Sequence, residues 1–235
     1  FDGMHKGHQF ILQSLIKFSK NFSIPSVVVT FDPHTNNVIF KKNDKILLPL
    51  EHKLKMIKKC GIDHIGIISF NEQISKLTAD LFLDKIIVKF NPKYILIGYD
   101  NSFGFNREGN YKYFHKNNKY NKIKFVECPK YTFEDCTNIK SSIIRGYILD
   151  GEVNKANLHL GHIYTIFGNI IKGNRIGRKI GYPTANINLI NKEQLVPSNG
   201  VYSVNLRIDN NVYSGICNIG HRPTLNISNE IKIEV

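Results

Sequence analysis

The sequence predicts an α/β domain with a parallel sheet, followed by an all-β domain. In the first part, continuous apolar runs such as 26–31 and 94–98 alternate with stretches of helical spacing. This alternation is typical of βαβ units, whose strands are buried on both faces. After about residue 160, short alternating segments rich in glycine replace these runs. We therefore predict two domains, residues 1–158 and 159–235.

Bulk composition limits the class of protein. The chain has 235 residues, of which 42% are hydrophobic, an ordinary value for a globular protein. Its four cysteines are scattered without a C-x-x-C pair, which argues against a zinc site or a disulfide framework and favours a cytoplasmic location. No apolar run reaches the roughly 20 residues that a membrane-spanning helix needs. No membrane association is predicted.

The net charge of +13 has two explanations. A basic chain suits nucleic acid or phosphorylated small molecules. Here the lysines are dispersed and are not interleaved with stacking aromatics, so we predict no nucleic-acid partner. The chain also begins at Phe1 and stops at Val235 inside expected strand regions, and we expect a fragment of a longer protein, with its oligomeric state left open.

The first eight residues contain two histidines three apart, with Gly7 between them. Apolar residues follow at helical spacing, so a helix is predicted to start here. Unpaired N–H groups and the positive end of the helix dipole then lie beside His5 and His8, and such a place suits a phosphate. Two surface histidines at an ordinary helix start remain the alternative.

Two predicted strands end in polar residues. Asp32 follows the first, and the Gly- and Asn-rich segment 98–110, which contains Asp100, follows another. In open parallel sheets ligands bind beyond the carboxyl ends of the strands, so Asp32 and Asp100 are candidates for holding a nucleotide or its metal. A turn capped by Asp32 and a plain surface loop at 98–110 are the alternatives.

The remaining elements of this domain end in a second candidate anion site. Helices are predicted at 50–60 and 78–89, strands at 64–70 and 125–128, and a short helix after residue 139. Ser141 and Ser142 stand at the start of that helix, with Arg145 one turn later. Hydroxyls and a guanidinium in this arrangement bind anions, although a simple N-cap explains the serines equally well.

Four segments of this domain carry a family resemblance: FDGMHKGHQ, TFDPHT, GYDNSFGFNREGN and IKSSIIR. In this order they resemble the adenylyltransferase domain of prokaryotic bifunctional riboflavin kinase/FAD synthetases, a Rossmann-like H-x-G-H nucleotidyltransferase fold. The resemblance implies that an adenylyl group passes from ATP to FMN, giving FAD and pyrophosphate. It implies phosphate contacts by five residues and a nucleotide or metal contact by one: His5, His8, Ser141, Ser142 and Arg145, and Asp100.

The chain departs from the family's usual residues at five positions. Thr35 stands where the family has Pro, Asn101 where it has Phe, Phe105 where it has a basic residue, Asn110 where it has Asp, and Lys140 where it has Ser. These departures concern the tightness of flavin and ATP binding more than the class of reaction.

Strands of the second domain are predicted at 164–168, 169–173, 201–208 and 212–220, the last two joined by a hairpin turn at Asn210-Asn211. The segment GNRIGRKIGYPTAN at 173–186 favours a loop around ATP phosphates. In it, Gly173 would allow close approach and Arg178 would pair with charge. Thr184 and Asn186 offer oxygen ligands to Mg²⁺, which takes few from protein. Barrel corners are the alternative for the glycines.

This domain resembles the riboflavin kinase domain of the same family through GRKIGYPTAN, NGVYSV and NIGHRPT. The resemblance implies an all-β barrel that phosphorylates riboflavin to FMN, with Thr184 and Asn186 on Mg·ATP and Arg222 at the binding site. It also implies a catalytic carboxylate in the strand after NIGHRPT, and Glu234 matches better than Glu230. Such a glutamate would accept the proton of the ribityl hydroxyl; an exposed strand glutamate is the alternative.

We therefore predict a two-module enzyme that makes FMN and then FAD, with Mg²⁺ as cofactor, ATP as co-substrate and flavins as the other small molecules bound. One rival is another H-x-G-H nucleotidyltransferase, against which the P-T-A-N segment argues. A second rival is a basic RNA-binding barrel fused to a nucleotide-binding domain, for which RNA binding with a steep salt dependence would be diagnostic.

Overall fold

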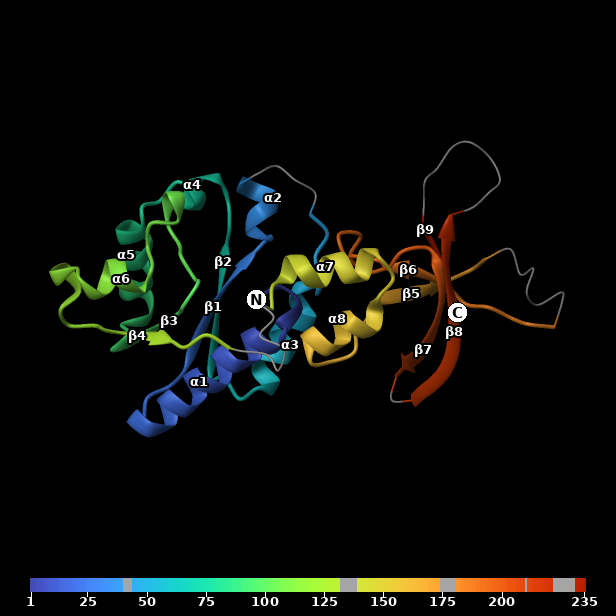
Figure 1. The fold of residues 1–235 in the computed structure, drawn as a ribbon, viewed down its shortest axis with the longest axis horizontal. Coiled ribbons are helices and arrows are strands. Elements are labelled where there is room, and N and C mark those ends of the chain that lie inside the picture. The colour runs from blue at the N-terminus through green and yellow to red at the C-terminus, as the bar shows by residue number, and fades with distance from the viewer. Residues whose placement is uncertain (40–43, 132–138, 174–180, 210, 222–230) are drawn as a thin grey trace. The chain divides into compact units, whose positions relative to one another are not determined.

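The structure is a computed structural model that describes residues 1–39, 44–131, 139–173, 181–209, 211–221 and 231–235. The chain divides into two compact units, Phe1–Lys140 and Ser141–Val235. In Figure 1 the first unit runs from blue to green and the second from yellow to red. Each unit has its own sheet structure and its own core.

The first unit contains the predicted alternation of strands and helices. Its elements, in chain order, are η1 (Asp2–Met4), α1 (Lys6–Phe22), β1 (Val27–Asp32), α2 (Thr35–Ile39), α3 (Leu50–Lys59), β2 (His64–Ser69), α4 (Glu72–Ser75), α5 (Ala79–Phe90), β3 (Tyr94–Gly98), η2 (Phe105–Arg107), α6 (Tyr111–His115), η3 (Asn118–Tyr120) and β4 (Lys124–Cys128). The helix predicted at the H-x-G-H motif therefore begins where expected.

The strands of this unit pair in parallel, as the βαβ pattern predicts. β1 pairs with β2 from Val27 opposite His64 to Asp32 opposite Ser69. β3 pairs with β4 in the same sense. The described strands form two parallel ladders of two strands each rather than one continuous sheet.

Helix α1 packs along β3 and runs in the opposite direction. Near its C-terminal end, the rings of Phe18 and Phe22 each lie 4.9 Å from the ring of Tyr94, the first residue of β3. Near its N-terminal end, a Cβ atom at Gly98, the last residue of β3, would lie 3.4 Å from Ile11 Cδ1. The N-terminus of α1 is thus directed past the carboxyl end of β3.

The loop after β3 is fastened to the start of α5. The carboxylate of Glu108 accepts a hydrogen bond from the backbone N–H of Ala79 at 2.9 Å, which satisfies a donor at the helix N-terminus. A Cβ atom at Gly104, whose φ is +81°, would lie 2.5 Å from Ala79 N, and one at Gly109 would lie 2.5 Å from Ala79 Cβ. These two glycines therefore allow the loop to pack closely against α5.

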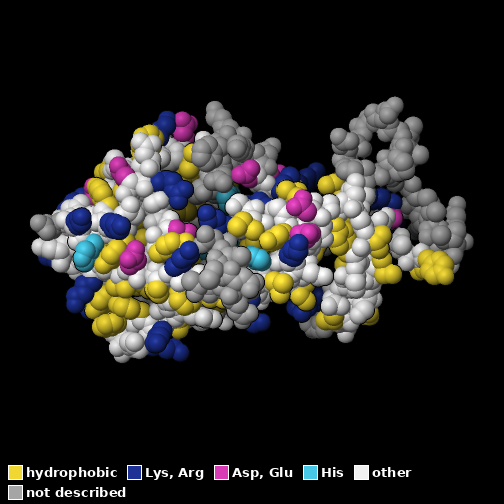
Figure 2. Space-filling view, in the orientation of Figure 1, with side chains coloured by type: hydrophobic (Ala, Val, Ile, Leu, Met, Phe, Trp, Pro, Cys, Tyr) yellow, Lys and Arg dark blue, Asp and Glu magenta, His cyan; other side chains and the backbone are white. Residues whose placement is uncertain are grey.

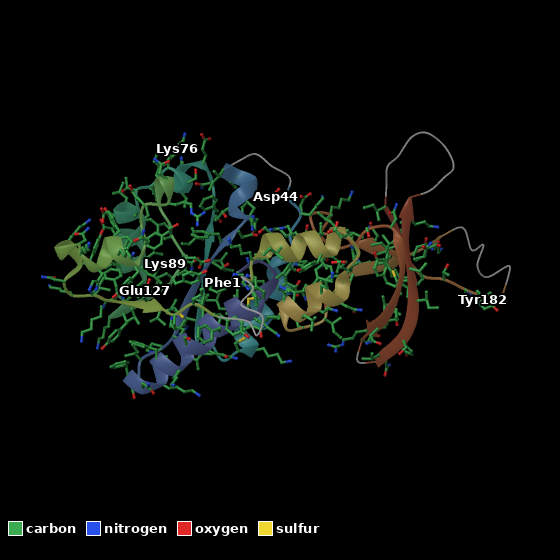
Figure 3. The ribbon with its side chains drawn as sticks, in the orientation of Figure 1. Phe1, Asp44, Lys76, Lys89, Glu127 and Tyr182 are labelled. Atoms are coloured by element: carbon green, nitrogen blue, oxygen red, sulfur yellow. The ribbon has the colours of Figure 1, made fainter. Side chains whose placement is uncertain are left out.

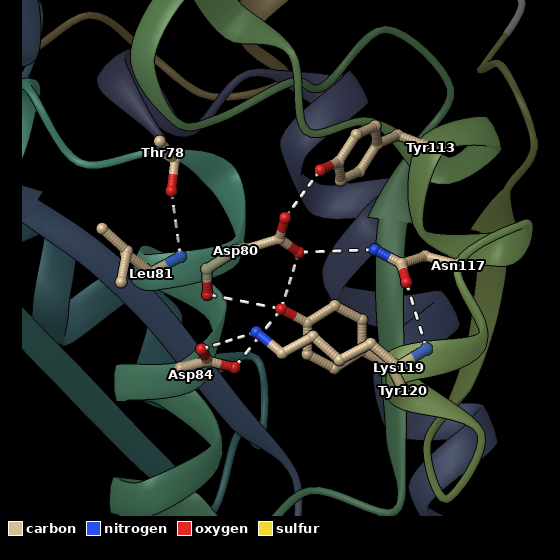
Figure 4. Close-up of polar contacts among 8 residues, drawn as sticks. All are labelled: Thr78, Asp80, Leu81, Asp84, Tyr113, Asn117, Lys119 and Tyr120. Carbon is tan, nitrogen blue, oxygen red and sulfur yellow. Dashed lines mark hydrogen bonds and ion pairs between the residues drawn. The ribbon is translucent and has the colours of Figure 1, made fainter.

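A polar cluster joins α5 to the segment before β4 (Figure 4). Both Tyr113 and Tyr120 donate their hydroxyl protons to the carboxylate of Asp80, each at 2.7 Å. Lys119 lies 2.8 Å from Asp84. Burial and the bond to Asp80 raise the pKa of Tyr120, so this hydroxyl stays a donor. The cluster holds the base of the loop that carries Asp100.

The second unit is a helical hairpin followed by an antiparallel sheet. Its elements are α7 (Ser141–Leu149), α8 (Val153–Leu160), β5 (Gly168–Ile171), β6 (Asn186–Leu189), β7 (Gly200–Ile208), β8 (Asn211–His221) and β9 (Ile231–Glu234). The strand order is β5-β6-β9-β8-β7, and each neighbouring pair is antiparallel. The described strands form a half-barrel of the all-β type predicted.

A hydrogen bond at 3.3 Å from Ser198 N, in the segment between β6 and β7, to Ile148 O connects helix α7 to the sheet of the second unit. The contact units therefore group α7 and α8 with the sheet. This grouping of elements does not test the predicted domain boundary between residues 158 and 159, which stays a prediction.

The strand predicted at 164–168 is wrong, because only Gly168 belongs to a strand. In this segment the backbone forms hydrogen bonds with side-chain amides instead of with a neighbouring strand. Asn157 accepts from Tyr164 N at 2.6 Å, while Gln194, 1% exposed, donates to Thr165 O at 2.7 Å and accepts from Phe167 N at 3.1 Å. Local alternation cannot reveal such distant partners. The hairpin between β7 and β8 is confirmed, but the turn predicted at Asn210-Asn211 is misplaced, because Asn211 is the first residue of β8 and pairs with Ile208. Asn210 lies outside the described residues.

Among the described residues, no helix is both long enough and apolar enough to cross a membrane.

Phe114 is the central residue of the first unit's aromatic core. It is 1% exposed and its ring stacks on those of Phe103 and Phe125 at 5.2 and 5.3 Å. Phe114→Ala should lower the free energy of unfolding of this unit by about 3–5 kcal/mol, since it removes buried ring atoms and leaves a cavity. Hydrogen exchange of the β3 and β4 amides measures this change.

The control is Val88→Ala, because Val88 is 87% exposed and its truncation should change stability by no more than about 0.5 kcal/mol. Equal effects of the two substitutions would contradict the assignment of Phe114 to the core.

Candidate active sites

A tight turn precedes α1 and fixes its first residues. Gly3 and Met4 both have positive φ values, 74° and 46°, and His5 is extended before the helix begins. The buried carboxylate of Asp2 accepts the backbone N–H of Leu47 with its two oxygens at 3.1 and 3.3 Å. This turn sets the entry angle of the chain into the helix.

The two histidines of the motif stack on each other. His5 caps α1, because its Nδ1 accepts the backbone N–H of His8 at 3.3 Å. The ring centroids of His5 and His8 are 3.6 Å apart with an angle of 16° between the planes. Phe1, labelled in Figure 3, places its ring 5.1 Å from that of His8. The pair is thus held rigidly at the helix N-terminus.

His8 carries a polar atom that the described residues leave without a hydrogen bond. Its Nδ1 is buried and has no partner among them. Burial, followed by nearby positive charges that include His5 and Lys53, holds the pKa of His8 well below its ordinary value. An imidazole in this state is neutral, and a buried polar atom without a partner costs free energy that a bound ligand would recover.

Asp32 and Asp100 also follow the carboxyl ends of strands. Asp32 is the last residue of β1 and is exposed. Asp100 lies in the exposed turn after β3, which is closed by a bond from Asn101 N to Gly98 O at 2.9 Å. Since α1 starts beyond the end of β3, the structure brings the histidines and Asp100 to the same end of that strand.

The glycines of the 98–110 loop have a different explanation from the one expected. Gly104 and Gly109 accommodate α5 and do not leave an open cradle. Arg107 donates to Ser102 Oγ at 2.9 Å within the loop. The loop's candidate for a nucleotide contact is therefore Asp100 and not its glycine backbone.

The second candidate anion site lies on α7. Ser141 begins the helix and Arg145 follows four residues later on the same face. Ser142 is exposed, while Ser141 and Arg145 are half-buried. These three residues belong to the second unit.

In the second unit the sheet register aligns three polar residues. Asn186 of β6 lies opposite Glu234 of β9, and Glu234 lies opposite Asn218 of β8. Directly opposite residues of antiparallel strands project from the same face, with Cβ atoms about 4.5–5.5 Å apart. Because the adjacent Ile219 and Ile233 belong to the core, the row Asn186, Glu234 and Asn218 faces the other side of the sheet.

Gly173 makes room for Asn186. A Cβ atom at Gly173 would lie 2.1 Å from Asn186 Nδ2, so any side chain at this position would displace the amide. Asn186 is 8% exposed, whereas Thr184, two residues earlier, is exposed. A hydroxyl, an amide oxygen and a nearby carboxylate fit Mg²⁺, which takes hard oxygen ligands, few of them from protein, and keeps its waters.

Lys232 forms an ion pair with Glu234. The two residues are two apart on β9 and therefore lie on the same face. Both side chains are about one-third exposed or less, 33% and 27%. The alternation of 231–235 predicts this proximity.

Two predicted site residues, Arg178 and Arg222, lie outside the described residues. Sequence reasoning missed Asp2, which holds the turn, and Lys53, whose charge acts on His8. Asp2 precedes Gly3 in the motif and was visible there. No motif in the sequence marked Lys53, because it lies in an ordinary amphipathic helix.

The two units define a nucleotide-dependent transferase, with an H-x-G-H α/β unit followed by an antiparallel sheet that carries a carboxylate. A model of the FAD synthetase family matches residues 1–143, and one of the riboflavin kinase family matches residues 160–235. The chain belongs to the bifunctional riboflavin kinase/FMN adenylyltransferase family. It accordingly uses ATP to phosphorylate riboflavin to FMN and to adenylylate FMN to FAD.

Curated relatives with this name match most of this chain and about 70% of their own length. The protein of Buchnera aphidicola subsp. Schizaphis graminum is 38% identical over 95% of this chain and 72% of its own. That of Bacillus subtilis is 34% identical over 95% of this chain and 71% of its own. A solved structure from Streptococcus pneumoniae, named as a macrolide-efflux protein, has 30% identity and a TM-score of 0.88 over 100% of this chain and 76% of its own; it supports the fold.

Acid should destabilise the first unit. The unfolded His8 takes up a proton near its ordinary pKa of 6.5, whereas the folded one resists protonation. The unfolded state therefore binds more protons, and the free energy of unfolding falls as the pH drops from about 6.5 toward the folded pKa, by at most about 1.4 kcal/mol per pH unit. Urea unfolding measures this slope when it is carried out at pH values from about 7.5 to 5.5 and monitored by proteolytic cleavage within α1.

His8→Gln should remove this part of the pH dependence. The matched control is His64→Gln, because His64 is an exposed histidine of the same unit and its substitution should leave the slope unchanged. The interpretation fails if both variants keep the wild-type slope.

Proposed function

We propose that FMN adenylylation takes place at the N-terminus of α1. His5 and His8 bind the phosphates of ATP, and Asp100 and Asp32 contact the nucleotide or its metal. The phosphate contacts that the family resemblance implies for Ser141, Ser142 and Arg145 belong to the start of α7 in the other unit and are proposed separately. The observation that carries this proposal is the buried Nδ1 of His8, which has no partner among the described residues, at a helix N-terminus suited to an anion.

Riboflavin phosphorylation is assigned to the face of the half-barrel that carries Asn186, Glu234 and Asn218. Glu234 is the general base: it accepts the proton of the ribityl hydroxyl as that oxygen attacks the γ-phosphorus and ADP leaves. Thr184 and Asn186 hold Mg²⁺ together with ATP, and when bound this ion neutralises phosphate charge. Gly173 lines the ATP site, and the family resemblance alone implies contributions from Arg178 and Arg222, which lie outside the described residues. The register that places Asn186 beside Glu234 supports this assignment.

Positioning and charge account for both reactions without a protein nucleophile. In adenylyl transfer the FMN phosphate attacks the α-phosphorus of ATP and pyrophosphate leaves. In the kinase reaction Lys232 orients the Glu234 carboxylate through their ion pair. The lysine keeps that carboxylate in place until the hydroxyl arrives.

The two activities divide the chain into residues 1–158 and 159–235, and the family matches at 1–143 and 160–235 support this division. The enzyme acts in the cytoplasm, in keeping with the three free cysteines Cys60, Cys128 and Cys217 among the described residues. It requires no nucleic-acid partner. Figure 2 shows basic side chains scattered over the visible face among uncharged and hydrophobic ones.

His8→Ala should lower FAD formation from FMN and ATP by at least about 100-fold, because it removes a phosphate contact that strengthens in the transition state. FMN formation from riboflavin should be retained. Separation of FMN and FAD by chromatography measures both. The exposed His64→Ala serves as the control, and an equal loss of both activities in His8→Ala would falsify the modular assignment.

Glu234→Gln should have the opposite effect. A glutamine cannot accept the proton, so FMN formation should fall by about 10²–10⁴-fold, while FAD formation from supplied FMN persists. Initial rates with each flavin measure the two activities. Glu152→Gln, at an exposed glutamate of the same unit, should change neither rate. Retention of FMN formation in Glu234→Gln would exclude Glu234 as the base.

A further inference from the structure

Lys53 lies on α3, outside every motif of the sequence. Its Nζ donates a hydrogen bond at 3.3 Å to the carbonyl oxygen of Phe31, the next-to-last residue of β1. Asp32 follows at the carboxyl end of that strand. The bond holds the ammonium group at a strand end where ligands of parallel sheets bind.

The electrostatic effects of Lys53 connect it to the H-x-G-H turn. After burial, the charge of Lys53 contributes to the lowered pKa of His8. The pKa of Lys53 itself is lowered by burial, against the opposing effects of Asp2 and Asp32. Helix α3 also contacts η1, the turn that precedes His5 and His8, so Lys53 stands on a helix beside the H-x-G-H turn.

The ammonium group retains hydrogen-bonding capacity. A lysine has three N–H donors, and within the described residues the Phe31 carbonyl is the one acceptor of Lys53 Nζ. A half-buried cation with two N–H groups left over favours an anion that offers several oxygens.

The neighbouring lysine on the same helix shows the contrast. Lys55 pairs with Glu51 at 2.6 Å, and the two side chains are 66% and 72% exposed. Two residues correspond to about 200° around a helix, so Lys53 and Lys55 lie on nearly opposite faces of α3. Lys55 is an ordinary surface lysine, whereas Lys53 faces the strand end.

We propose that Lys53 binds the leaving pyrophosphate of ATP during FMN adenylylation. Negative charge builds up on this group as the bond from the α-phosphorus to the bridging oxygen breaks. A neutral His8 provides hydrogen bonds but no charge, so a fixed cation at the same place stabilises the leaving group. Lys53 acts through its charge and hydrogen bonds: it forms no covalent bond with the substrate and transfers no proton to it. The inference rests on the proposed location of adenylylation at the N-terminus of α1.

The test compares Lys53→Met with Lys53→Arg, Lys55→Met and His8→Ala in the whole chain. FAD formation from FMN and Mg·ATP gives kcat and KM, and added pyrophosphate gives an inhibition constant. Lys53→Met should lower kcat/KM for ATP by about 10- to 100-fold, the equivalent of one charged hydrogen bond, and weaken pyrophosphate inhibition similarly. Lys53→Arg should keep most of both, and Lys55→Met should match the wild type.

Riboflavin phosphorylation is the internal control for folding, and Lys53→Gln replaces Lys53→Met if the latter unfolds. Wild-type kcat/KM and inhibition in the neutral variant would overturn the inference. So would a loss of rate with unchanged pyrophosphate inhibition in both Lys53→Met and Lys53→Arg, because that result indicates a purely structural lysine. If His8→Ala retains FAD formation, the proposed site itself is wrong; if His8→Ala alone loses it, only the role of Lys53 is wrong.

Discussion

The packing of α1 against β3 in opposite directions is the constraint on which the first unit's proposed active site depends. Contacts of Phe18 and Phe22 with Tyr94 at one end, and of Ile11 with Gly98 at the other, fix the direction of the helix. The helix N-terminus is thereby directed past the carboxyl end of the strand. Backbone N–H groups, a capping imidazole and the positive end of the dipole then converge where the following loop carries carboxylates.

In the second unit the equivalent constraint is strand register. β9 lies between β6 and β8, so Glu234 has Asn186 on one side and Asn218 on the other. The alternate residues Ile233 and Ile219 enter the core. A slip of one residue would turn the carboxylate into the core, so burial of these isoleucines holds the face that carries Asn186, Glu234 and Asn218 in place.

Glycines illustrate why a motif does not by itself identify a binding surface. Gly173 gives space to the Asn186 amide, whereas Gly104 and Gly109 give space to Ala79 at the start of α5. All three stand in polar, glycine-rich segments and are indistinguishable there by composition. The atoms that an added Cβ would meet distinguish Gly173, which lies near the proposed metal site, from Gly104 and Gly109, which serve packing.

The sequence by itself determined the alternation of strands and helices in the first unit and the helix start just after His5, because periodicity and motif chemistry are local. It also singled out Thr184, Asn186 and Glu234 as candidate site residues. It misassigned 164–167, where the amide of Gln194 replaces a strand neighbour, and it gave no sign of Lys53. Only the tertiary structure decided these points. Backbone partners and electrostatic neighbours come from residues far apart in the chain, and no local pattern records which of them meet.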